Sequence, residues 1–298
     1  MIIDASKVVG LVLHFRTARS TLTCLHSLFD EGIRVCVLVD NSEDGGASVA
    51  DMHAELEAWH TAGMNVDVLV CDRNLGFAKG VNVGLARAVQ YDAKAVLLIN
   101  SDAEIERGSL ASLIRGLDRA RILVPRRRSR RDAPAVGLFG FYQAATAILA
   151  RKQRLGFSQY PSGCCLLLRA DLTHQPLFDD DFFFYGEDVM LARTLQMRGV
   201  PVVECADAVV IHAGSESAKN GSMFYEYHIN RGHWLLGKKL ASNSFQRVAY
   251  IVCRCVTLPL RALVRSLRFR SLTPFRGLIA ATVDVMKARC RNFTPPTR

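Results

Sequence analysis

Short apolar runs alternate with longer amphipathic stretches over the first hundred residues. The apolar runs, rich in Val, Leu and Ile, lie at residues 8–13, 35–39, 66–70 and 95–99. Helical patterns separate them at residues 20–29, 47–60 and 78–89. Strands that alternate with helices of this length are typical of a mainly parallel sheet covered on both faces, with ligands bound at the carboxyl ends of the strands. The pattern therefore predicts an α/β fold.

The alternation weakens after residue 102. A helical pattern at 108–117 precedes an arginine-rich segment, 126–131, and a run without charged residues, 133–150. The uncharged run is long enough to be a transmembrane candidate. Its proline and glycines favour instead a loop and a helix lining a substrate cleft, with shallow lipid contact as the alternative. Strand-like patterns return at 163–168 and 200–210.

The last amphipathic segment, residues 244–268, carries its arginines on a single helical face. At 100° per residue the five arginines fall within an arc of about 60°, and the remaining circumference is largely apolar. They are Arg247, Arg254, Arg261, Arg265 and Arg268. The stripe favours a helix that lies in the interface of an anionic membrane leaflet through residues 244–270. The alternative is a helix packed on the rest of the protein with its arginines in solvent.

The distribution of charge also points to an anionic partner for this segment. The 298 residues carry a formal net charge of +10, and between Arg231 and Arg298 fourteen Lys and Arg face a single acid, Asp284. Such a basic segment is typical of proteins that meet a polyanion or an anionic membrane surface. Nucleic acid is a poor candidate, because neither interleaved aromatic residues nor a recognisable binding motif accompanies the arginines.

Composition places the chain among globular proteins, with 50% hydrophobic and 22% charged residues. Its length suffices for one large domain or two packed ones. The nine cysteines show no zinc-site spacing, and we expect them to be free thiols of a reducing cytosol. The first apolar run is too short and wrongly flanked for a secretion signal, so the prediction is a cytoplasmic protein.

Two of the apolar runs lead into carboxylates. Asp40 ends the run in VLVDNSEDG, where it could accept a hydrogen bond from a nucleobase N–H or simply belong to a turn. Asp102 follows the run in VLLINSDAEI, where a carboxylate suits Mg²⁺ or Mn²⁺ on a diphosphate, with a helix N-cap as the alternative. His212 also follows a strand-like run and gains value only beside these acids.

Glycines recur at four-residue spacing in NLGFAKGVNVGL, residues 74–85. They would let a helix start approach a phosphate, or let the helix pack closely on a neighbour. Neither the dinucleotide-binding fingerprint nor a Walker loop is present. The pattern alone leaves both interpretations open.

An adjacent carboxylate pair, Glu187 and Asp188, stands at the start of an amphipathic helix in FFFYGEDVMLARTLQMRGV, residues 182–200. A helix N-terminus stabilises the charge of a carboxylate, and four aromatic residues precede the pair. The arrangement is typical of a general base that faces a cleft.

Six segments in order along the chain resemble the blocks of glycosyltransferase family 2: DNSEDG, NLGFAKGVNVG, LLINSD, SGCCLLLR, FFFYGEDVMLARTLQMRGV and VIHAGSES. The resemblance covers residues 7–240 and is nearest to rhamnosyltransferase-like enzymes of bacterial surface-polysaccharide assembly. It implies the GT-A fold, a Rossmann-like, mostly parallel sheet flanked by helices. Residues 1–102 would bind a nucleotide-sugar and 103–240 the acceptor, together forming a catalytic domain 1–240, and 241–298 would form a basic amphipathic tail.

The same resemblance implies a role for each matching residue. Asp188 would be the general base, Glu187 would position it or the acceptor, and Asp102 with His212 would hold Mg²⁺ or Mn²⁺. The donor pocket would be formed by Asp40, Asn74, Gly76, Asn82 and Ser101. We thus expect a metal-dependent, inverting transferase that moves L-rhamnose from dTDP-rhamnose to a lipid-linked saccharide. It would be peripheral on the cytoplasmic face of the inner membrane.

Three departures from the family pattern leave alternatives open. Asn100 stands in place of the first acid of the D-x-D motif, Met190 replaces another acid, and HFR follows the first strand where a different turn is usual. A catalytically degenerate domain that acts as a membrane-associated scaffold is therefore one alternative. A nucleotidyltransferase is the other, although HFRTARST lacks the glycine-rich loop that such enzymes usually need.

Overall fold

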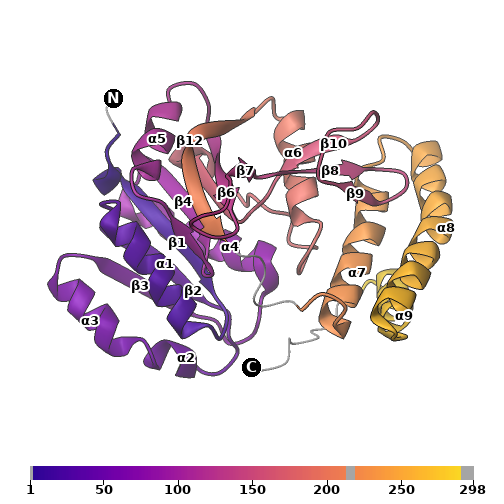
Figure 1. The fold of residues 1–298 in the computed structure, drawn as a ribbon, viewed down its shortest axis with the longest axis horizontal. Coiled ribbons are helices and arrows are strands. Elements are labelled where there is room, and N and C mark those ends of the chain that lie inside the picture. The colour runs from indigo at the N-terminus through magenta and orange to yellow at the C-terminus, as the bar shows by residue number, and fades with distance from the viewer. Residues whose placement is uncertain (1–2, 213–218, 290–298) are drawn as a thin grey trace. The chain divides into compact units, whose positions relative to one another are not determined.

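A computed structural model describes residues 3–212 and 219–289. Its largest element is a sheet whose first four strands are parallel, in the spatial order β3-β2-β1-β4 (Figure 1). These strands are β1 (Val8–His14), β2 (Val35–Asp40), β3 (Asn65–Val70) and β4 (Ala95–Asn100). They confirm the four predicted strands, and the apolar side chains of β1, β2 and β4 form much of the core.

Helices connect the parallel strands, as the spacing of the apolar runs predicts. They are α1 (Ala18–Asp30), α2 (Ala47–Ala50), α3 (His53–Thr61) and α4 (Gly76–Ala88). Helix α4 packs so closely on the sheet that Gly80 and Gly84 have no room for a side chain. A Cβ at Gly80 would lie 2.7 Å from Leu13 Cδ1, and one at Gly84 would collide with Leu11. These two glycines therefore serve helix packing, one of the two interpretations that the sequence left open.

The sheet continues with strands of mixed direction. They are β5 (Ala103–Ile105), β6 (Ile122–Arg128), β7 (Val136–Gly137), β11 (Cys165–Arg169) and β12 (Val202–His212). β11 lies antiparallel between β4 and β6, β6 is parallel to β12, and β5 runs antiparallel along β12. Helix α5 (Ser109–Gly116) confirms the predicted helix after β5. The chain thus has the predicted α/β architecture.

Two compact units divide the chain. The first holds the large sheet and comprises the described parts of Met1–Leu138, Pro161–Phe178 and Leu195–Gly214. The second comprises the described parts of Phe139–Tyr160, Asp179–Thr194 and Ser215–Arg298. The two units follow from contacts within the chain and do not test function. The division into a catalytic domain, 1–240, and a tail, 241–298, therefore stays a prediction. Three short 3₁₀ helices complete the elements of the first unit: η1 (Ala5–Lys7), η2 (Val89–Tyr91) and η3 (Ala170–Leu172).

A small sheet replaces the predicted loop and helix at residues 133–150. Its strands, in the order β10-β8-β9, are β8 (Phe139–Gln143), β9 (Ile148–Ala150) and β10 (Ser158–Pro161). The helix prediction is wrong because alternating aromatic residues favour a pleated strand over a helix in this segment. A glycine is also required in β8, since a Cβ at Gly140 would collide with the Tyr160 ring.

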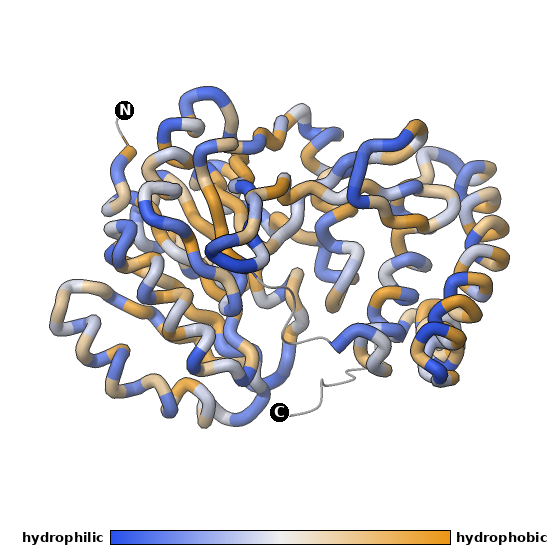
Figure 2. The backbone as a smooth tube through the Cα atoms, viewed as in Figure 1, coloured by the Kyte–Doolittle hydropathy of each residue, from blue (hydrophilic) through white to orange (hydrophobic). Residues whose placement is uncertain are grey.

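Four helices follow in chain order: α6 (Glu187–Met197), α7 (Met223–Lys239), α8 (Ser244–Phe269) and α9 (Thr273–Met286). Helices α7, α8 and α9 pack on one another within the second unit. α8 confirms the helix predicted at 244–268, and Figure 2 shows hydrophobic and hydrophilic residues alternating along it.

The predicted orientation of the α8 arginines is wrong. Arg254 is completely buried, and Glu226 of α7, also completely buried, pairs with both Arg261 and Arg265. The two partners are close, with Arg265 Nε 2.8 Å from Glu226 Oε1 and Arg261 Nη1 3.2 Å from Glu226 Oε2. The arginines lie on one helical face, as predicted. However, the three central ones, Arg254, Arg261 and Arg265, donate to acceptors inside the second unit. Their charged groups therefore bind partners within the second unit and do not form the exposed stripe that the sequence predicts.

No helix in the described ranges is long and apolar enough to cross a membrane. The eight cysteines that the structure describes are free thiols, as predicted. Cys290, the polar stretch 213–217 after His212, and the end of the predicted tail, 290–298, lie outside the described residues.

Candidate active site

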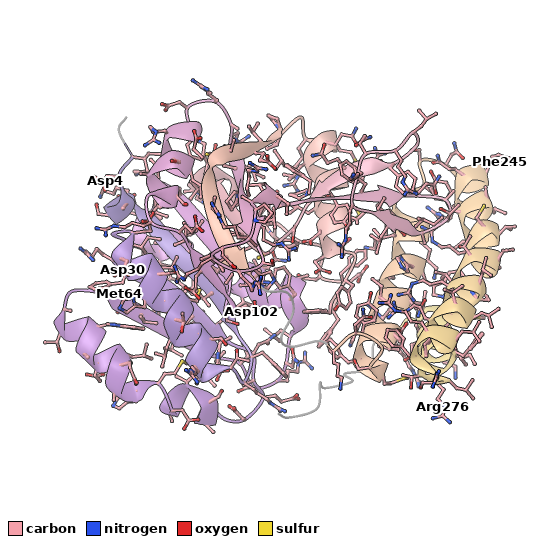
Figure 3. All side chains as sticks on the ribbon, viewed as in Figure 1. Asp4, Asp30, Met64, Asp102, Phe245 and Arg276 are labelled. Carbon is pink, nitrogen blue, oxygen red and sulfur yellow. The ribbon has the colours of Figure 1, made fainter. Side chains whose placement is uncertain are left out.

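The strand ends of the first unit bring an acid and a histidine together. β5 pairs with β12 so that Ala103 lies opposite His212, which places the preceding residue, Asp102, beside the histidine. Asp102 is labelled in Figure 3 at this end of the sheet. His212 Nδ1 lies 3.4 Å from Asp102 Oδ1, with side chains 9% and 10% exposed. The two predicted metal ligands are therefore neighbours. Asp102 does not form the helix N-cap that was its alternative interpretation.

The side chains of Asp102 and His212 suit a cation that is bound together with a second molecule. A carboxylate oxygen and an imidazole nitrogen both suit Mn²⁺, and the carboxylate also suits Mg²⁺. Within the ranges that the structure describes, no three His, Cys, Asp or Glu side chains gather in a way that would hold a metal ion. A cation held by Asp102 and His212 would therefore need further ligands from a bound molecule or from water.

An arginine that the sequence analysis did not single out lies next to this pair. Arg127 of β6 is opposite Val210 of β12, so its side chain is on the same sheet face as that of His212, two residues further on. Arg127 Nη1 lies 3.4 Å from the His212 carbonyl oxygen. The arginines on either side of it have carboxylate partners, Glu204 for Arg126 and Glu106 for Arg128. Only the strand register distinguishes Arg127 from its neighbours in the arginine run.

Three predicted donor-site residues gather around Asn41, which the sequence analysis passed over. Asn41 Nδ2 donates to Asn74 Oδ1 (2.9 Å) and to the Gly76 carbonyl (3.1 Å), and Asn41 Oδ1 accepts from the Leu75 N–H (2.7 Å). Asp40 precedes it and is 1% exposed, and its Oδ2 has no hydrogen-bond partner among the described residues. The end of β2 is therefore a fixed polar group in which one buried carboxylate oxygen lacks a partner among the described residues.

Gly76 and Asn82 have roles that the contacts define. Gly76 begins α4 with φ at 78°, a conformation that glycine adopts without strain. Asn82 Oδ1 accepts from the N–H groups of Leu177 and Phe178, and its Nδ2 donates to the Phe178 carbonyl. These bonds give Asn82 a structural role, and its part in donor binding stays a prediction. Ser101 is half-buried in the turn before Asp102.

In the second unit a tight turn carries Glu187 and Asp188 into α6. Tyr185 and Gly186 have φ angles of 67° and 100°. Gly232 of α7 allows this turn to lie against the helix, because a Cβ at position 232 would collide with the Tyr185 carbonyl oxygen. Glycine at position 232 therefore helps to position the turn from which Glu187 and Asp188 follow.

The two carboxylates have different environments. Glu187 is 7% exposed, and its Oε2 has no hydrogen-bond partner among the described residues. Burial, and then the nearby charge of Asp188, raise the pKa of Glu187 well above its ordinary value. Asp188 is half-buried in the first turn of α6, where the helix dipole favours a negative charge. Burial therefore favours the neutral form of Glu187, while the helix N-terminus favours a negative charge at Asp188.

The model of the family described as Glycosyl transferase family 2 matches residues 11–174, more than half of the sequence. This chain belongs to glycosyl transferase family 2. The matched range of the family 2 protein includes Asp40, Asn74 and Asp102 and ends before the carboxylate pair of α6.

Solved structures show that this family 2 protein has the GT-A fold. The mannosyltransferase PcManGT from Pyrobaculum calidifontis, in complex with GDP-Man and Mn²⁺, has a TM-score of 0.57 at 16% identity over 96% of this chain and 90% of its own. GalNAc-T7 with UDP, GalNAc and Mn²⁺ has a TM-score of 0.56 at 12% identity over 94% of this chain and 57% of its own. TarS 1–349 of S. aureus in complex with UDP-GlcNAc has 0.50 at 14% identity over 95% and 92%. No curated protein matches the sequence.

A buried histidine supports the aromatic segment that precedes the carboxylate pair of this family 2 protein. His228 of α7 stacks on Phe183 with ring centroids 4.7 Å apart. Neither of its ring nitrogens has a hydrogen-bond partner among the described residues. Burial, helped by the charge of Arg231, lowers the pKa of His228 to about 3 from the ordinary 6.5. The imidazole is therefore neutral in the folded protein.

Replacing His228 with phenylalanine is expected to reduce acid sensitivity. Between pH 6.5 and 3 the unfolded chain binds a proton at His228 that the folded protein does not, so stability falls as the pH falls through this window. His228→Phe removes that contribution, up to about 1.4 kcal/mol for each pH unit. Burial also lowers the pKa values of His14 and His233, so part of the acid loss should remain.

Urea unfolding at pH 7.5 and pH 5 checks this expectation. Exposed His174 provides the matched control, since its replacement by phenylalanine leaves the buried site intact. Equal acid losses in the wild type and in His228→Phe would show that His228 is not a neutral, desolvated group.

Proposed function

We propose that this family 2 protein transfers a sugar from a nucleoside-diphosphate donor to an acceptor hydroxyl group, with inversion at the anomeric carbon. The observation that carries the proposal is the contact between Asp102 and His212 at the strand ends. The protein shares its fold with enzymes solved with GDP-Man, UDP-GlcNAc and Mn²⁺. An acid and an imidazole in contact suit a cation bound to a diphosphate.

The first unit would bind the donor. Asp102 and His212 would hold Mg²⁺ or Mn²⁺, which when bound neutralises the negative charge of the departing diphosphate. Arg127 would add a fixed positive charge on the same sheet face. Asp40 would contact the nucleobase, and Asn41 would hold the start of α4, with Asn74 and Gly76, against this end of the sheet.

Asp188 would be the general base. Direct displacement needs a proton acceptor on the acceptor hydroxyl while the diphosphate leaves from the opposite face of the sugar. Burial disfavours the charged form of Glu187, whereas the N-terminus of α6 favours the charged form of Asp188. Asp188 would take the hydroxyl proton as the new C–O bond forms, and Glu187 would position Asp188 or the acceptor. Attack and departure on opposite faces give an inverted product.

The finer assignment follows the sequence resemblance. The donor would be dTDP-rhamnose, the transferred sugar L-rhamnose, and the acceptor a lipid-linked saccharide of cell-surface polysaccharide assembly. A lipid-linked acceptor places the reaction at a membrane, and we assign the protein to the cytoplasmic face of the inner membrane as a peripheral protein.

A thermal-shift screen of nucleotide-sugars with and without Mn²⁺ tests the proposal. A ligand present at 100 times its dissociation constant stabilises the native state by about 2.7 kcal/mol, which raises the melting temperature by several degrees. We expect dTDP-rhamnose to give the largest shift, and only with a divalent cation. No shift and no transfer with any donor would support the scaffold alternative.

A further inference from the structure

Helix α8 presents an apolar face to solvent. Eight large apolar residues on it are between 46% and 85% exposed: Phe245, Val248, Val252, Val256, Leu260, Leu263, Val264 and Leu267. At 100° per residue they centre on the side opposite the arginine stripe. Phe245, labelled in Figure 3, projects away from the start of α8. This face is the reverse of the one that the sequence analysis assigned to a membrane.

Buried polar contacts fix the rotation of α8 about its own axis. The Arg254 guanidinium donates to the carbonyl oxygens of Ala144 (2.7 Å), His233 (2.9 Å) and Ala145 (3.2 Å). Room for it exists because Gly237 of α7 has no side chain, and a Cβ there would lie 2.9 Å from Arg254 Cζ. If the apolar face turned inward, Arg254 would lose the carbonyl oxygens that it binds. Arg261 and Arg265 would likewise lose the carboxylate of Glu226. Outward exposure of the apolar face is therefore built into the fold of the second unit.

The exposed charges of the segment that carries this face are of one sign, and two of them, Arg247 and Arg268, belong to the stripe on the opposite side of α8. Between residues 241 and 289 the only acid is Asp284, which is 1% exposed and accepts a hydrogen bond from the Tyr227 hydroxyl. The exposed charged residues of the same range are all basic: Arg247, Arg268, Arg270, Arg276, Lys287 and Arg289. Figure 3 labels Arg276 at the start of α9. Large apolar residues are also exposed at the N-cap of α9, Leu272, and within the helix, Ile279 and Met286.

We propose that the apolar face of α8 is a docking surface for an anionic lipid bilayer. The apolar side chains would enter the acyl boundary while the exposed cations of the same segment attract the anionic surface. A second copy of the chain fits the charges poorly, because its own cations would lie against these. The docking surface itself does not depend on the proposed function. Its purpose does rest on that function, because docking would hold the enzyme where a lipid-linked acceptor is found.

The proposal divides the binding between two sources. Each Val or Leu side chain moved out of water contributes about tenfold or more in affinity. Each cation near an anionic surface contributes about fivefold at low salt and less at high salt. Binding should therefore depend on the apolar face first and on anionic lipid and salt second.

Vesicle sedimentation with the full-length protein tests the proposal. The probes are vesicles of pure phosphatidylcholine and vesicles of phosphatidylcholine and phosphatidylglycerol in equal amounts. We expect wild-type protein to sediment with the mixed vesicles, much less with pure phosphatidylcholine, and less again in high salt. The variant Val252→Glu/Val256→Glu/Leu263→Glu should lose about 1,000-fold or more in partition coefficient. Leu155→Glu, a fully exposed leucine in a loop of the same unit, should sediment as wild type does.

Thermal-shift titration of each variant with the donor separates the two proposals. A triple variant that binds donor normally but not vesicles supports the docking surface. Wild-type protein that binds donor but no vesicles, or a triple variant that still sediments, overturns the docking surface and leaves the proposed function standing. A wild-type dimer that the triple variant converts to a monomer, without any vesicle binding, would assign the face to self-association instead.

Discussion

Replacing Asp188 with asparagine is expected to reduce turnover by about 10³-fold while the affinity for the nucleotide-sugar stays close to that of the wild type. A positioned general base contributes about 10²–10⁴-fold to proton transfer, and the amide of asparagine cannot accept the hydroxyl proton. Asparagine has nearly the size of aspartate, so the first turn of α6 should keep its shape. A loss confined to turnover identifies an interaction that acts in the transition state.

Initial rates at saturating donor, together with donor affinity by calorimetry, measure this effect. Asp180→Asn serves as the control, because Asp180 is an exposed acid shortly before the same helix and should leave both quantities unchanged. Normal transfer by Asp188→Asn would remove Asp188 from the role of base. Glu187→Gln should retain far more activity, since burial disfavours the charged form of Glu187 and an uncharged glutamine has nearly the same size.

The second large effect concerns the donor side. Asp102→Ala is expected to weaken nucleotide-sugar binding in Mn²⁺ by about 100-fold, because one of two protein ligands to the cation is lost. His212→Ala should act in the same direction. Their double variant should fall well short of the product of the two effects, since both residues serve a single ion. Without a divalent cation, the three variants and the wild type should bind the donor almost equally weakly.

Calorimetric titration of the nucleotide-sugar, with Mn²⁺ and with a chelator, distinguishes these cases. Asp132→Ala is the matched control, because Asp132 is 75% exposed in a loop of the same unit and pairs only weakly with Arg130. Affinities of Asp102→Ala that equal the wild type in Mn²⁺ would show that the Asp102–His212 pair is a structural contact.

Local patterns in the sequence were enough to predict the parallel half of the sheet. The strands β1, β2 and β4 are continuous apolar runs because both of their faces are covered. The strands beyond them were harder to predict, since β5 has only three residues and β6 ends in three arginines. Charged residues at a strand end are stabilised by partners such as Glu204 and Glu106, which no local pattern reveals.

The candidate site was predictable in its parts but not in its arrangement. The proximity of Asp102 and His212 depends on the register between β5 and β12, which are about a hundred residues apart in sequence. The same holds for Arg127, which only the pairing of β6 with β12 places beside His212. The division of charge between Glu187 and Asp188 depends on burial, and the sequence shows only that the two acids are adjacent.

The arginine stripe of α8 shows where a periodic pattern reaches its limit. A period reveals that one face of a helix differs from the other, but it does not say which face meets solvent. That choice was decided by a buried acid on another helix, Glu226, and by backbone carbonyls that accept from Arg254. Polar groups with internal partners can be buried, and the apolar side is then left exposed.

A crystal structure with Mn²⁺, an unreactive donor analogue and an acceptor tests the central claim most directly. Anomalous scattering locates the manganese independently of the protein. We expect manganese to be bound directly by Asp102 and His212. We also expect Asp188 within hydrogen-bond reach of the acceptor hydroxyl, on the side of the anomeric carbon away from the diphosphate. Manganese bound without either Asp102 or His212, or Asp188 turned away from the acceptor, would contradict the claim.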